Sequence, residues 1–168
     1  ANGESDANSD LIAGLCEGGR IVAVAWQERA GAMQADECET LATPTPTGWR
    51  LTGAKDFVHG AGQANGLIVS ARAADGVGLF YVQPGDAGVT LETRYFTDGT
   101  TCHRMTLRDV EVSNASCIAS PGSGASALDD ALDETRIAAS AEMLGCAQQS
   151  LDITLDYLRQ RKQFGKAI

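Results

Sequence analysis

The last residues of the chain carry its clearest arrangement of chemical groups. Arg159, Arg161, Lys162 and Lys166 place four cations within eight residues, with no acidic side chain among them, although the formal net charge of the 168-residue chain is -9. A guanidinium group pairs with phosphate oxygens through two parallel hydrogen bonds, and the neighbouring Phe164 offers an aromatic face for packing. This basic cluster is therefore suited to binding an anion.

The residues before the basic cluster follow a helical pattern. Spacings of seven, four and three separate Leu144, Leu151, Leu155 and Leu158, which places them on one face of a helix. Gly165 tolerates the positive φ of a helix C-terminus, so we expect the helix to end at Phe164 and Gly165. Cations are also favoured at the negative end of a helix dipole. The cluster is thus open to two interpretations, stabilisation of a helix end or anion binding.

Length and composition indicate a globular protein. The chain of 17.5 kDa can bury a core, 43% of its residues are apolar, and it has 19 Gly but only 4 Pro. A sequence pI of about 4.6 argues against nucleic-acid binding, because the basic residues cluster only near the C-terminus. No segment approaches a membrane span, and the acidic, polar residues 1–6 are unlike a signal peptide.

The cysteines and histidines argue against a metal site. Five cysteines are dispersed without a Cys-x-x-Cys pair, at Cys16, Cys38, Cys102, Cys117 and Cys146. An odd, scattered set fits buried thiols in a reducing cytoplasm better than a disulfide framework or a zinc site. The two histidines, His59 and His103, are isolated from each other in the sequence. We therefore expect no metal and a cytoplasmic location.

Periodicity divides the chain into a β-region and a helical region. After a polar arm over 1–8 and a short helix over 11–16, strands are expected at 21–26, 40–42, 48–55, 66–73, 78–82, 89–93 and 105–112. Near-alternation in the last of these breaks at Arg108 and Asp109, which predicts a bulge or bend. Short strands at this spacing are typical of an antiparallel β-barrel or sandwich.

A linker rich in Gly and Ser precedes a change of period from two to 3.6. From about Ser126 to Arg161 the pattern predicts one helix on the order of 50 Å long. Acidic residues lie at its start and the basic cluster at its end, so both termini match the helix dipole. A small β-domain cannot cover an apolar stripe of that length. The stripe therefore predicts association with a partner.

Motifs spread along most of the chain resemble those of the acyl-CoA dehydrogenase family. The pattern Tyr157-x-x-x-Arg161-x-Gln163-Phe164-Gly165 is similar to a helix-end motif of that family. The family's N-G-x-K-x-W-I-T strand resembles Gly53-x-Lys55-x-Phe57-Val58, its L-x-F-x-D-V-x-V-P resembles Leu107-x-x-Val110-x-Val112, and the start of its first C-terminal helix resembles Leu132-Asp133-x-x-Arg136. The order and spacing of the motifs together carry the resemblance.

The resemblance implies a domain organisation and a cofactor. Residues 21–119 would be the family's middle β-domain, and residues 120–168 a linker and the first helix of a truncated C-terminal helical domain, with residues 1–20 as a polar arm and short helix. The intact protein would bind FAD and act on an acyl-CoA thioester. Arg161 and Phe164 would then reach the FAD of a neighbouring subunit, with Arg161 at its pyrophosphate.

Several family positions carry altered side chains. Gln27 stands where the family's T-E-P turn has Thr, and Met33 replaces the Ser that bonds the acyl-CoA pantetheine. Phe57 and His59 replace the Trp and Thr of W-I-T, in which the Thr bonds flavin N5. Backbone contacts to a flavin survive such changes, whereas hydroxyl contacts do not. Phe57 also fits a plain core position and His59 a structural or surface one, while Glu28 is expected to order its turn.

The chain offers no catalytic base. Asp133 and Arg136 share a helix face, so they fit a surface ion pair worth under about 1 kcal/mol as well as the family's role near the acyl-CoA. Most members carry the base as a Glu beyond the position of residue 168. Others place it just before this Arg, where Thr135 cannot act as a carboxylate base. Glu134 is adjacent but rotated by about 100°.

Two functions follow from the resemblance. The first is a fragment of an FAD-dependent acyl-CoA dehydrogenase, an oxidoreductase of fatty acid metabolism, which is inactive alone. The second is a non-catalytic partner subunit of a heteromeric complex that has lost flavin contacts, as the side chains of Gln27, Met33 and His59 indicate. Either way we expect a homo-oligomer or a complex with a related subunit. The acyl-chain specificity is not encoded here, because the family's later helices form the pocket floor.

Overall fold

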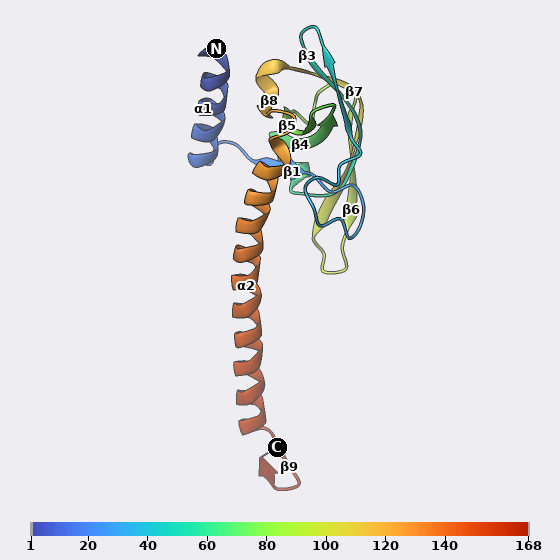
Figure 1. Cartoon of the computed structure of the whole chain (residues 1–168). Helices are drawn as coiled ribbons and strands as arrows, with labels where there is room; N and C mark the ends of the chain where they lie inside the picture. The colour runs from blue at the N-terminus through green and yellow to red at the C-terminus, as the bar shows by residue number, and fades with distance from the viewer. Residues whose placement is uncertain (1, 168) are drawn as a thin grey trace. The chain divides into compact units, whose positions relative to one another are not determined.

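The chain forms two compact units, Ala1–Asp129 and Asp130–Ile168. A computed structural model describes the backbone of residues 2–167 and the side chains of residues 9–166. The first unit holds helix α1 (Asn2–Cys16) and strands β1 (Val22–Ala25), β2 (Leu41–Thr45), β3 (Gly48–His59), β4 (Gly66–Ala73), β5 (Gly76–Val82), β6 (Val89–Tyr95), β7 (Thr101–Ser113) and β8 (Cys117–Ala119) (Figure 1). Short 3-10 helices, η1 (Ala61–Gln63) and η2 (Asn114–Ser116), follow β3 and β7.

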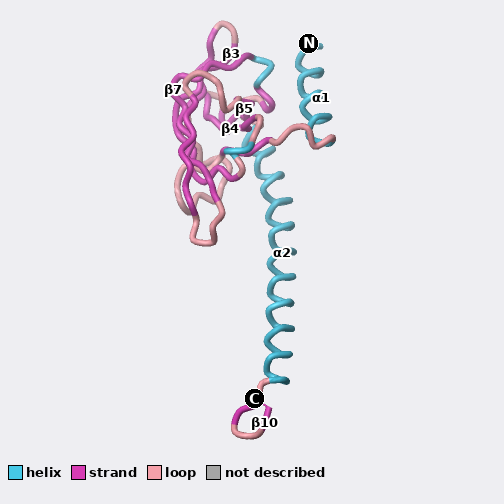
Figure 2. Tube along the Cα trace, turned by 180° about the vertical axis from the view of Figure 1, so that it is seen from behind, coloured by secondary structure: helices cyan, strands magenta, loops and turns pink. Residues whose placement is uncertain are grey.

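The second unit is dominated by one helix. Helix α2 (Gly124–Gln160) begins in the first unit, and Figure 2 draws it as one unbroken helix. Two short strands follow, β9 (Lys162–Gln163) and β10 (Lys166–Ala167), which pair antiparallel. No helix among the described residues combines the length and apolarity needed to cross a membrane.

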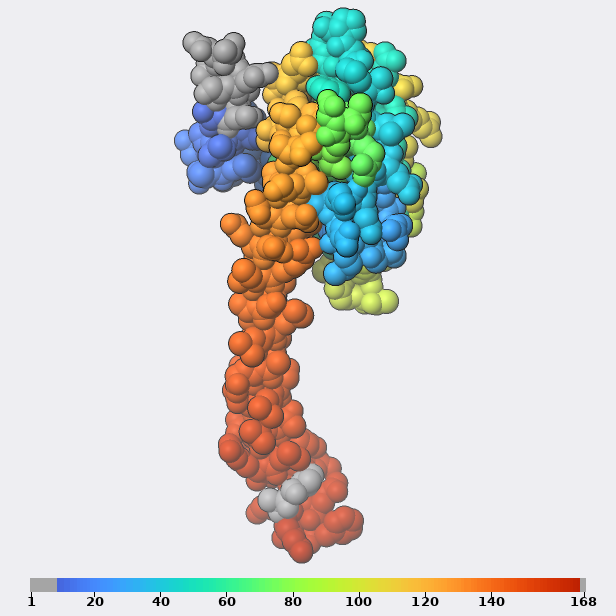
Figure 3. Space-filling view, viewed as in Figure 1, coloured from blue at the N-terminus to red at the C-terminus, as the bar shows by residue number. Residues whose placement is uncertain are grey.

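The strands of the first unit make one sheet in the order β6-β7-β3-β2-β4-β5-β8, with β1 paired to β4. The pairs along this order are antiparallel except for β2 with β4, which meet in parallel at Leu41 and Arg72. On the face shown in Figure 3, segments from distant parts of the sequence form a continuous surface of side chains. The predicted fold class is an antiparallel β-barrel or sandwich followed by one long α-helix. It is confirmed as a mostly antiparallel β-sheet followed by one long helix.

The core lies on the inner face of this sheet. Its fully buried members come from alternating positions of the strands and include Leu51, Leu67, Val69, Phe80 and Met105. The Phe80 ring packs against Trp49 with centroids 5.5 Å apart and the planes tilted by 59°. Strand β4 is buried at most of its positions, because it lies in the middle of the sheet with neighbours on both sides.

Three features differ from the sequence prediction. Strand β1 pairs in parallel with β4, Val22 opposite Gly66, because the intervening β2–β3 hairpin returns the chain to the same end of the sheet. Strand β8 was not expected. Helix α1 begins at Asn2, so residues 2–8, expected as a polar arm, are helical and the expected helix over 11–16 is only its last part.

The end of the long helix also differs. It stops at Gln160, one residue from the Arg161 that the helical period predicts but before Phe164 and Gly165, and the backbone N–H of Arg161 still donates to the Tyr157 carbonyl at 2.8 Å. Phe164 and Gly165 instead form the turn between β9 and β10, where both have positive φ, 52° and 79°. Two successive residues with positive φ match the right-handed twist of a tight hairpin, which explains why they are used there.

The predicted break in β7 is confirmed. Leu51 pairs with Val110, but Gly53 already pairs with Leu107, so β7 carries one extra residue at this point. Asp109 has a φ of 52°, an uncommon conformation for a residue with a side chain. The bulge lies where the sequence alternation stops, at Arg108 and Asp109.

Candidate functional site

The end of β1 and a bulge in β3 together form the candidate site. The pairing of β3 with β7 slips between Lys55 and Val58, and Phe57 within this bulge has a φ of 55°. The backbone N–H of Asp56 donates to the Gln27 carbonyl at 2.7 Å, which ties the segment after β1 to the bulge. Strained backbone of this kind concentrates at functional sites, where the surrounding contacts maintain it.

Three residues that sequence reasoning singled out meet at this position. Gln27, Phe57 and His59 line one open pocket of about 280 Å³, together with Ala30 and Gly31. The Gln27 side-chain amide donates to the Ala32 carbonyl at 3.1 Å and so shapes the turn that forms one wall. Residues far apart in the sequence therefore converge on one concave surface. An aromatic ring and an imidazole on its wall suit a planar aromatic ligand.

His59 is positioned by an aromatic partner that the sequence did not reveal. Its ring stacks on Phe96 with centroids 5.6 Å apart and an interplanar angle of 9°. Phe96 follows β6 and remains partly exposed, with 36% of its surface accessible. No local pattern predicts this pair, because His59 ends β3 whereas Phe96 lies in the turn after β6, so the two residues meet only in the folded chain. The stack holds the His59 ring at the pocket.

Asp56, which belongs to the same bulge of β3, forms a cluster of charges with two arginine side chains. The Asp56 carboxylate is 3.1 Å from Arg104 and 3.7 Å from Arg94, and it also accepts the backbone N–H of Phe57 at 3.2 Å. The Arg94 and Arg104 side chains are partly exposed, whereas the Asp56 side chain is largely buried. The carboxylate thus stabilises the strained backbone at Phe57 while its charge is balanced by two guanidinium groups.

A buried lysine anchors the two segments that form the pocket. Lys55 is fully buried, and its Nζ donates to Glu28 Oε1 at 2.6 Å, to Ser70 Oγ at 2.9 Å and to the Trp26 carbonyl at 3.4 Å. Because Glu28 follows Gln27 and Lys55 lies two residues before Phe57, this ion pair holds both walls of the pocket. A buried charge is tolerated when it is paired and fully hydrogen-bonded, as here.

Glu28 also orders the turn that follows it, as expected from the sequence. Its carboxylate accepts the backbone N–H of Glu39 at 2.7 Å and of Thr40 at 2.9 Å. Burial raises the pKa of Glu28. The hydrogen bonds from Lys55 and Thr40 and the positive charge of Lys55 outweigh burial and lower the pKa from 4.5 to about 2. Glu28 is therefore ionised at neutral pH.

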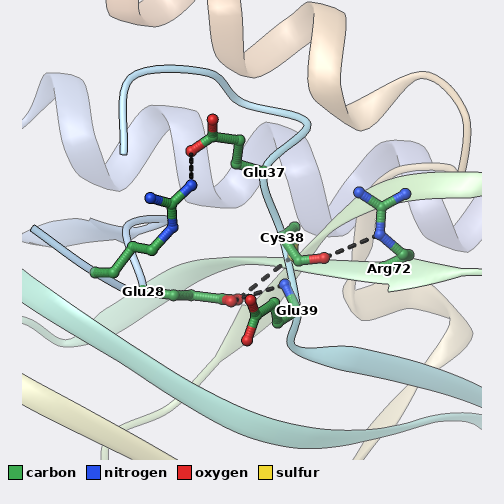
Figure 4. A pocket seen from close by; sticks show the side chains of 6 residues that line it. Glu28, Glu37, Cys38, Glu39 and Arg72 are labelled. Carbon is green, nitrogen blue, oxygen red and sulfur yellow. Dashed lines mark hydrogen bonds and ion pairs between the residues drawn. The ribbon is translucent and has the colours of Figure 1, made fainter. Parts of the chain in front are cut away.

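A second pocket of about 290 Å³ borders Glu28, the partner of Lys55 in this ion pair. It is lined by Glu28, Arg29, Glu37, Cys38, Glu39 and Arg72 (Figure 4). Arg72 Nε donates to the Cys38 carbonyl at 2.9 Å, and Arg29 pairs with Glu37 at 2.8 Å. Burial raises the pKa of the Cys38 thiol despite the nearby Lys55, so the thiol is protonated at neutral pH. These contacts explain the shape of the loop from Gln27 to Thr40.

The remaining predicted residues are not among those that line the first pocket. Met33 sits on the same loop as Gln27 and is 66% exposed, outside the residues that line the pocket. Asp133 and Arg136 on α2 form an ion pair at 2.5 Å, with both side chains largely exposed. Arg161 and Phe164 follow α2, and Phe164 is fully exposed. Met33 shares its loop with Gln27, and the other four residues belong to the second unit.

Comparison with known proteins identifies relatives along nearly the whole chain. Residues 122–168 match the acyl-CoA dehydrogenase C-terminal domain family. The probable acyl-CoA dehydrogenase FadE25 of Mycobacterium tuberculosis is 28% identical over 99% of this chain and 45% of its own length. The 3-sulfinopropanoyl-CoA desulfinase of Paraburkholderia xenovorans is 30% identical over 98% of this chain and 45% of its own length. The chain thus spans less than half the length of these curated relatives.

Solved structures share the fold. The ChsE4-ChsE5 complex from Mycobacterium tuberculosis contains a chain with a TM-score of 0.77 and 25% identity, over 92% of this chain and 40% of that one. PigA with FAD and proline gives a TM-score of 0.89 at 24% identity, over 97% of this chain and 45% of that one, a likeness of fold. The chain is thus related to the acyl-CoA dehydrogenases, and it corresponds to their middle β-domain and first C-terminal helix.

Proposed function

We propose that the intact protein is an FAD-dependent acyl-CoA dehydrogenase and that residues 1–129 supply one wall of its flavin site. The observation that carries this proposal is the convergence of Gln27, Phe57 and His59 on one pocket. The family resemblance assigns flavin contacts to these three positions, which lie on two separate segments. FAD supplies the chemistry of the reaction, acceptance of a hydride from the substrate Cβ at flavin N5.

The residues of the pocket fit an aromatic cofactor. Phe57 provides an apolar face, the stacked His59 and Phe96 provide a second aromatic surface, and the backbone around the bulge provides N–H groups. Gln27 and His59 lack the hydroxyl groups of the family's Thr residues, so the proposed flavin contacts come from the backbone, the imidazole and the amide. The role of these residues is to bind and orient the cofactor and to exclude water from one side.

Other residues complete the proposed site in the assembled protein. Arg161 is proposed to pair with the FAD pyrophosphate of a neighbouring subunit, and Phe164 to pack on that cofactor, as the family resemblance assigns them. Met33, Asp133 and Arg136 are proposed to lie near the acyl-CoA thioester. Thr135 stands where some family members carry the catalytic base, so residues 1–168 supply no group for removing the Cα proton. We therefore propose that this chain alone is inactive.

The alternative function is a non-catalytic partner subunit of a heteromeric complex. Gln27, Met33 and His59 each replace a hydroxyl group that the family uses for flavin or substrate. The structural relative from the ChsE4-ChsE5 complex supports this alternative, because that protein is part of a complex of two named components. In this case the fold is kept while the partner binds the flavin and carries out the chemistry.

Domain organisation and location are proposed on the same basis. We propose an N-terminal segment over 1–20, the middle β-domain over 21–119, and a linker with the first C-terminal helix over 120–168. The dispersed cysteines support a location in the cytoplasm. A homo-oligomer, or a heteromer with a related subunit, is the proposed assembly, because Arg161 and Phe164 act in trans in the family that this chain resembles.

The visible absorption spectrum of the purified full-length protein separates the two functions. A bound flavin that bleaches when an acyl-CoA thioester is added supports the dehydrogenase. A colourless protein that becomes active only when mixed with a related subunit supports the partner function and contradicts the dehydrogenase.

A matched pair of arginine variants tests the proposed flavin contact. Arg161→Ala should lower the flavin content of the purified protein, because one guanidinium fork to the pyrophosphate is lost. Arg159→Ala is the control, since Arg159 is already paired with Asp156 at 3.1 Å on the exposed helix. Equal flavin content in both variants contradicts the role proposed for Arg161.

A further inference from the structure

A buried cysteine lies in contact with the amine of Lys55. The Lys55 Nζ donates to Cys38 Sγ at 3.4 Å, and only 0% and 5% of the surfaces of these two residues are exposed. The Glu28 carboxylate lies 2.6 Å from Nζ and 3.6 Å from Sγ, and Ser70 Oγ lies 2.9 Å from Nζ and 3.9 Å from Sγ. The same two polar side chains thus hold a thiol and a primary amine together.

The thiol and the amine come from separate segments, and the fold fixes both. Lys55 lies in β3, whereas Cys38 lies in the loop between β1 and β2. Arg72 Nε donates to the Cys38 carbonyl at 2.9 Å, and the Cys38 backbone N–H donates to the Asp36 carbonyl at 2.9 Å. Reacting atoms held about 3–3.5 Å apart are placed for bond formation. The separation of Nζ and Sγ falls within this range.

The pocket beside Cys38 gives a small polar oxidant access to the sulfur. Cys38 lines this cavity of about 290 Å³, which Figure 4 shows from close by. The other lining residues are all charged, namely Glu28, Arg29, Glu37, Glu39 and Arg72. Lys55 is not one of the lining residues, so an oxidant that enters the cavity meets the sulfur before the amine.

We propose that hydrogen peroxide joins Cys38 to Lys55 through a covalent N–S bond, a sulfenamide. In the first step, peroxide transfers one oxygen atom to the Cys38 thiol, which gives a sulfenic acid and one water, and the sulfur loses two electrons. In the second step, the Lys55 nitrogen bonds to this electrophilic sulfur and the sulfenic hydroxide leaves. The ammonium group gives up two protons, one to the leaving hydroxide, which becomes water, and one to solvent.

The link changes the contacts that hold this part of the first unit together. The nitrogen bonded to sulfur carries no ammonium charge, so Glu28 loses its cation, and the loop that contains Cys38 is tied to β3 by a bond. Burial raises the pKa of the Cys38 thiol despite the positive charge of Lys55, so oxidation is slow at neutral pH and accelerates as the pH rises. Two molecules of a thiol reductant reverse the link, because they restore the amine and the thiol and become a disulfide.

Peptide mapping of the full-length protein after treatment with hydrogen peroxide tests the link. Trypsin cleaves after Lys and Arg, so the untreated protein gives Cys38 and Lys55 in separate peptides. A linked Lys55 resists cleavage, and we expect peptide 30–50 joined to peptide 51–72, two hydrogen atoms lighter than their sum. Oxidation of Met33 adds oxygen to the first of these peptides but joins no peptides. Treatment with a thiol reductant should separate the two peptides again.

Matched variants identify the two reacting groups. Cys38→Ser should abolish the linked product, whereas Cys117→Ser, at a partly buried cysteine of β8, should leave its yield unchanged. Lys55→Met combined with Glu28→Gln keeps the thiol without the amine, so a sulfenic acid that dimedone traps should form there, without any linked peptide.

Three results would overturn the sulfenamide. The first is a treated parent protein in which trypsin still cleaves fully after Lys55, whether or not Cys38 carries added oxygen. The second is a linked product that retains an oxygen atom between the two peptides. The third is a linked product that persists in Cys38→Ser.

Discussion

The ammonium group of Lys55 shows how one side chain shapes the candidate site. Its hydrogen bonds join three parts of the first unit, namely the segment after β1 at Trp26 and Glu28, the bulge of β3, and Ser70 in β4. Lysine is almost never fully buried unless it is paired, so no sequence pattern indicated that Lys55 lies in the core. The family motif drew attention to this position, but the ion pair with Glu28 became visible only in the folded chain.

Replacing Lys55 tests the importance of this anchor. We expect Lys55→Met to lower the free energy of unfolding by about 3–5 kcal/mol, because it leaves the buried Glu28 carboxylate without its cation. Adding Glu28→Gln to Lys55→Met should recover part of this loss, since the remaining amide is neutral. Urea denaturation of both variants measures the difference. A Lys55→Met protein as stable as the parent would contradict the anchoring role.

Glu28 makes the stability of the sheet depend on pH in the acidic range. Its pKa is 4.5 in the unfolded chain and about 2 in the folded chain, so the folded state favours the ionised form. The resulting stabilisation, about 3 kcal/mol, is complete above pH 4.5 and is lost as the pH falls from 4.5 toward 2. Urea denaturation across this range should show the loss in the parent protein. In Glu28→Gln the same pH change should have a smaller effect.

At the scale of elements, the sequence predicted most strands because alternation and turn residues are local signals. The bulge in β7 at Arg108 and Asp109 was visible because the alternation breaks there. The parallel pairing of β1 with β4 was not, because strand direction depends on how the chain between them is routed. Motif spacing singled out Gln27, Phe57 and His59 as candidates. No local pattern indicated the stacking of Phe96 on His59, because the two residues are far apart in the sequence.

The contact between β3 and β7 depends on a glycine at its edge. A Cβ added at Gly48 would lie 2.0 Å from the Val112 carbonyl oxygen, and the backbone of Ser113 is also within 3 Å. We expect Gly48→Ala to lower the free energy of unfolding by about 2 kcal/mol, because the two strands must separate. Gly85→Ala is the control, since a Cβ there meets open space. Urea denaturation compares the two, and equal stabilities would contradict this close approach.

At the scale of the whole molecule, the proposed flavin site needs more than the residues of this chain. The pocket lined by Gln27, Phe57 and His59 is open and, at about 280 Å³, lies at the lower limit of small-molecule pockets. We expect residues 1–168 to bind FAD weakly, and the full-length protein to bind it tightly. Isothermal titration of each protein with FAD measures this difference. Tight, stoichiometric binding by residues 1–168 would show that these residues form a complete site.

The order of strands in the sheet has a consequence for how the chain acquires its structure. The hairpins β4–β5 and β6–β7 join neighbouring segments, but the long ladder between β3 and β7 begins with Gly48 opposite Ser113. This ladder can form only after the whole intervening chain has been synthesised and its ends have met, a step with a large entropic cost. During synthesis the edge of β3 that pairs with β7 therefore stays unpaired until β7 has left the ribosome. The slow step of folding is expected to be the docking of β7 on β3, and chaperone protection would matter most in that interval.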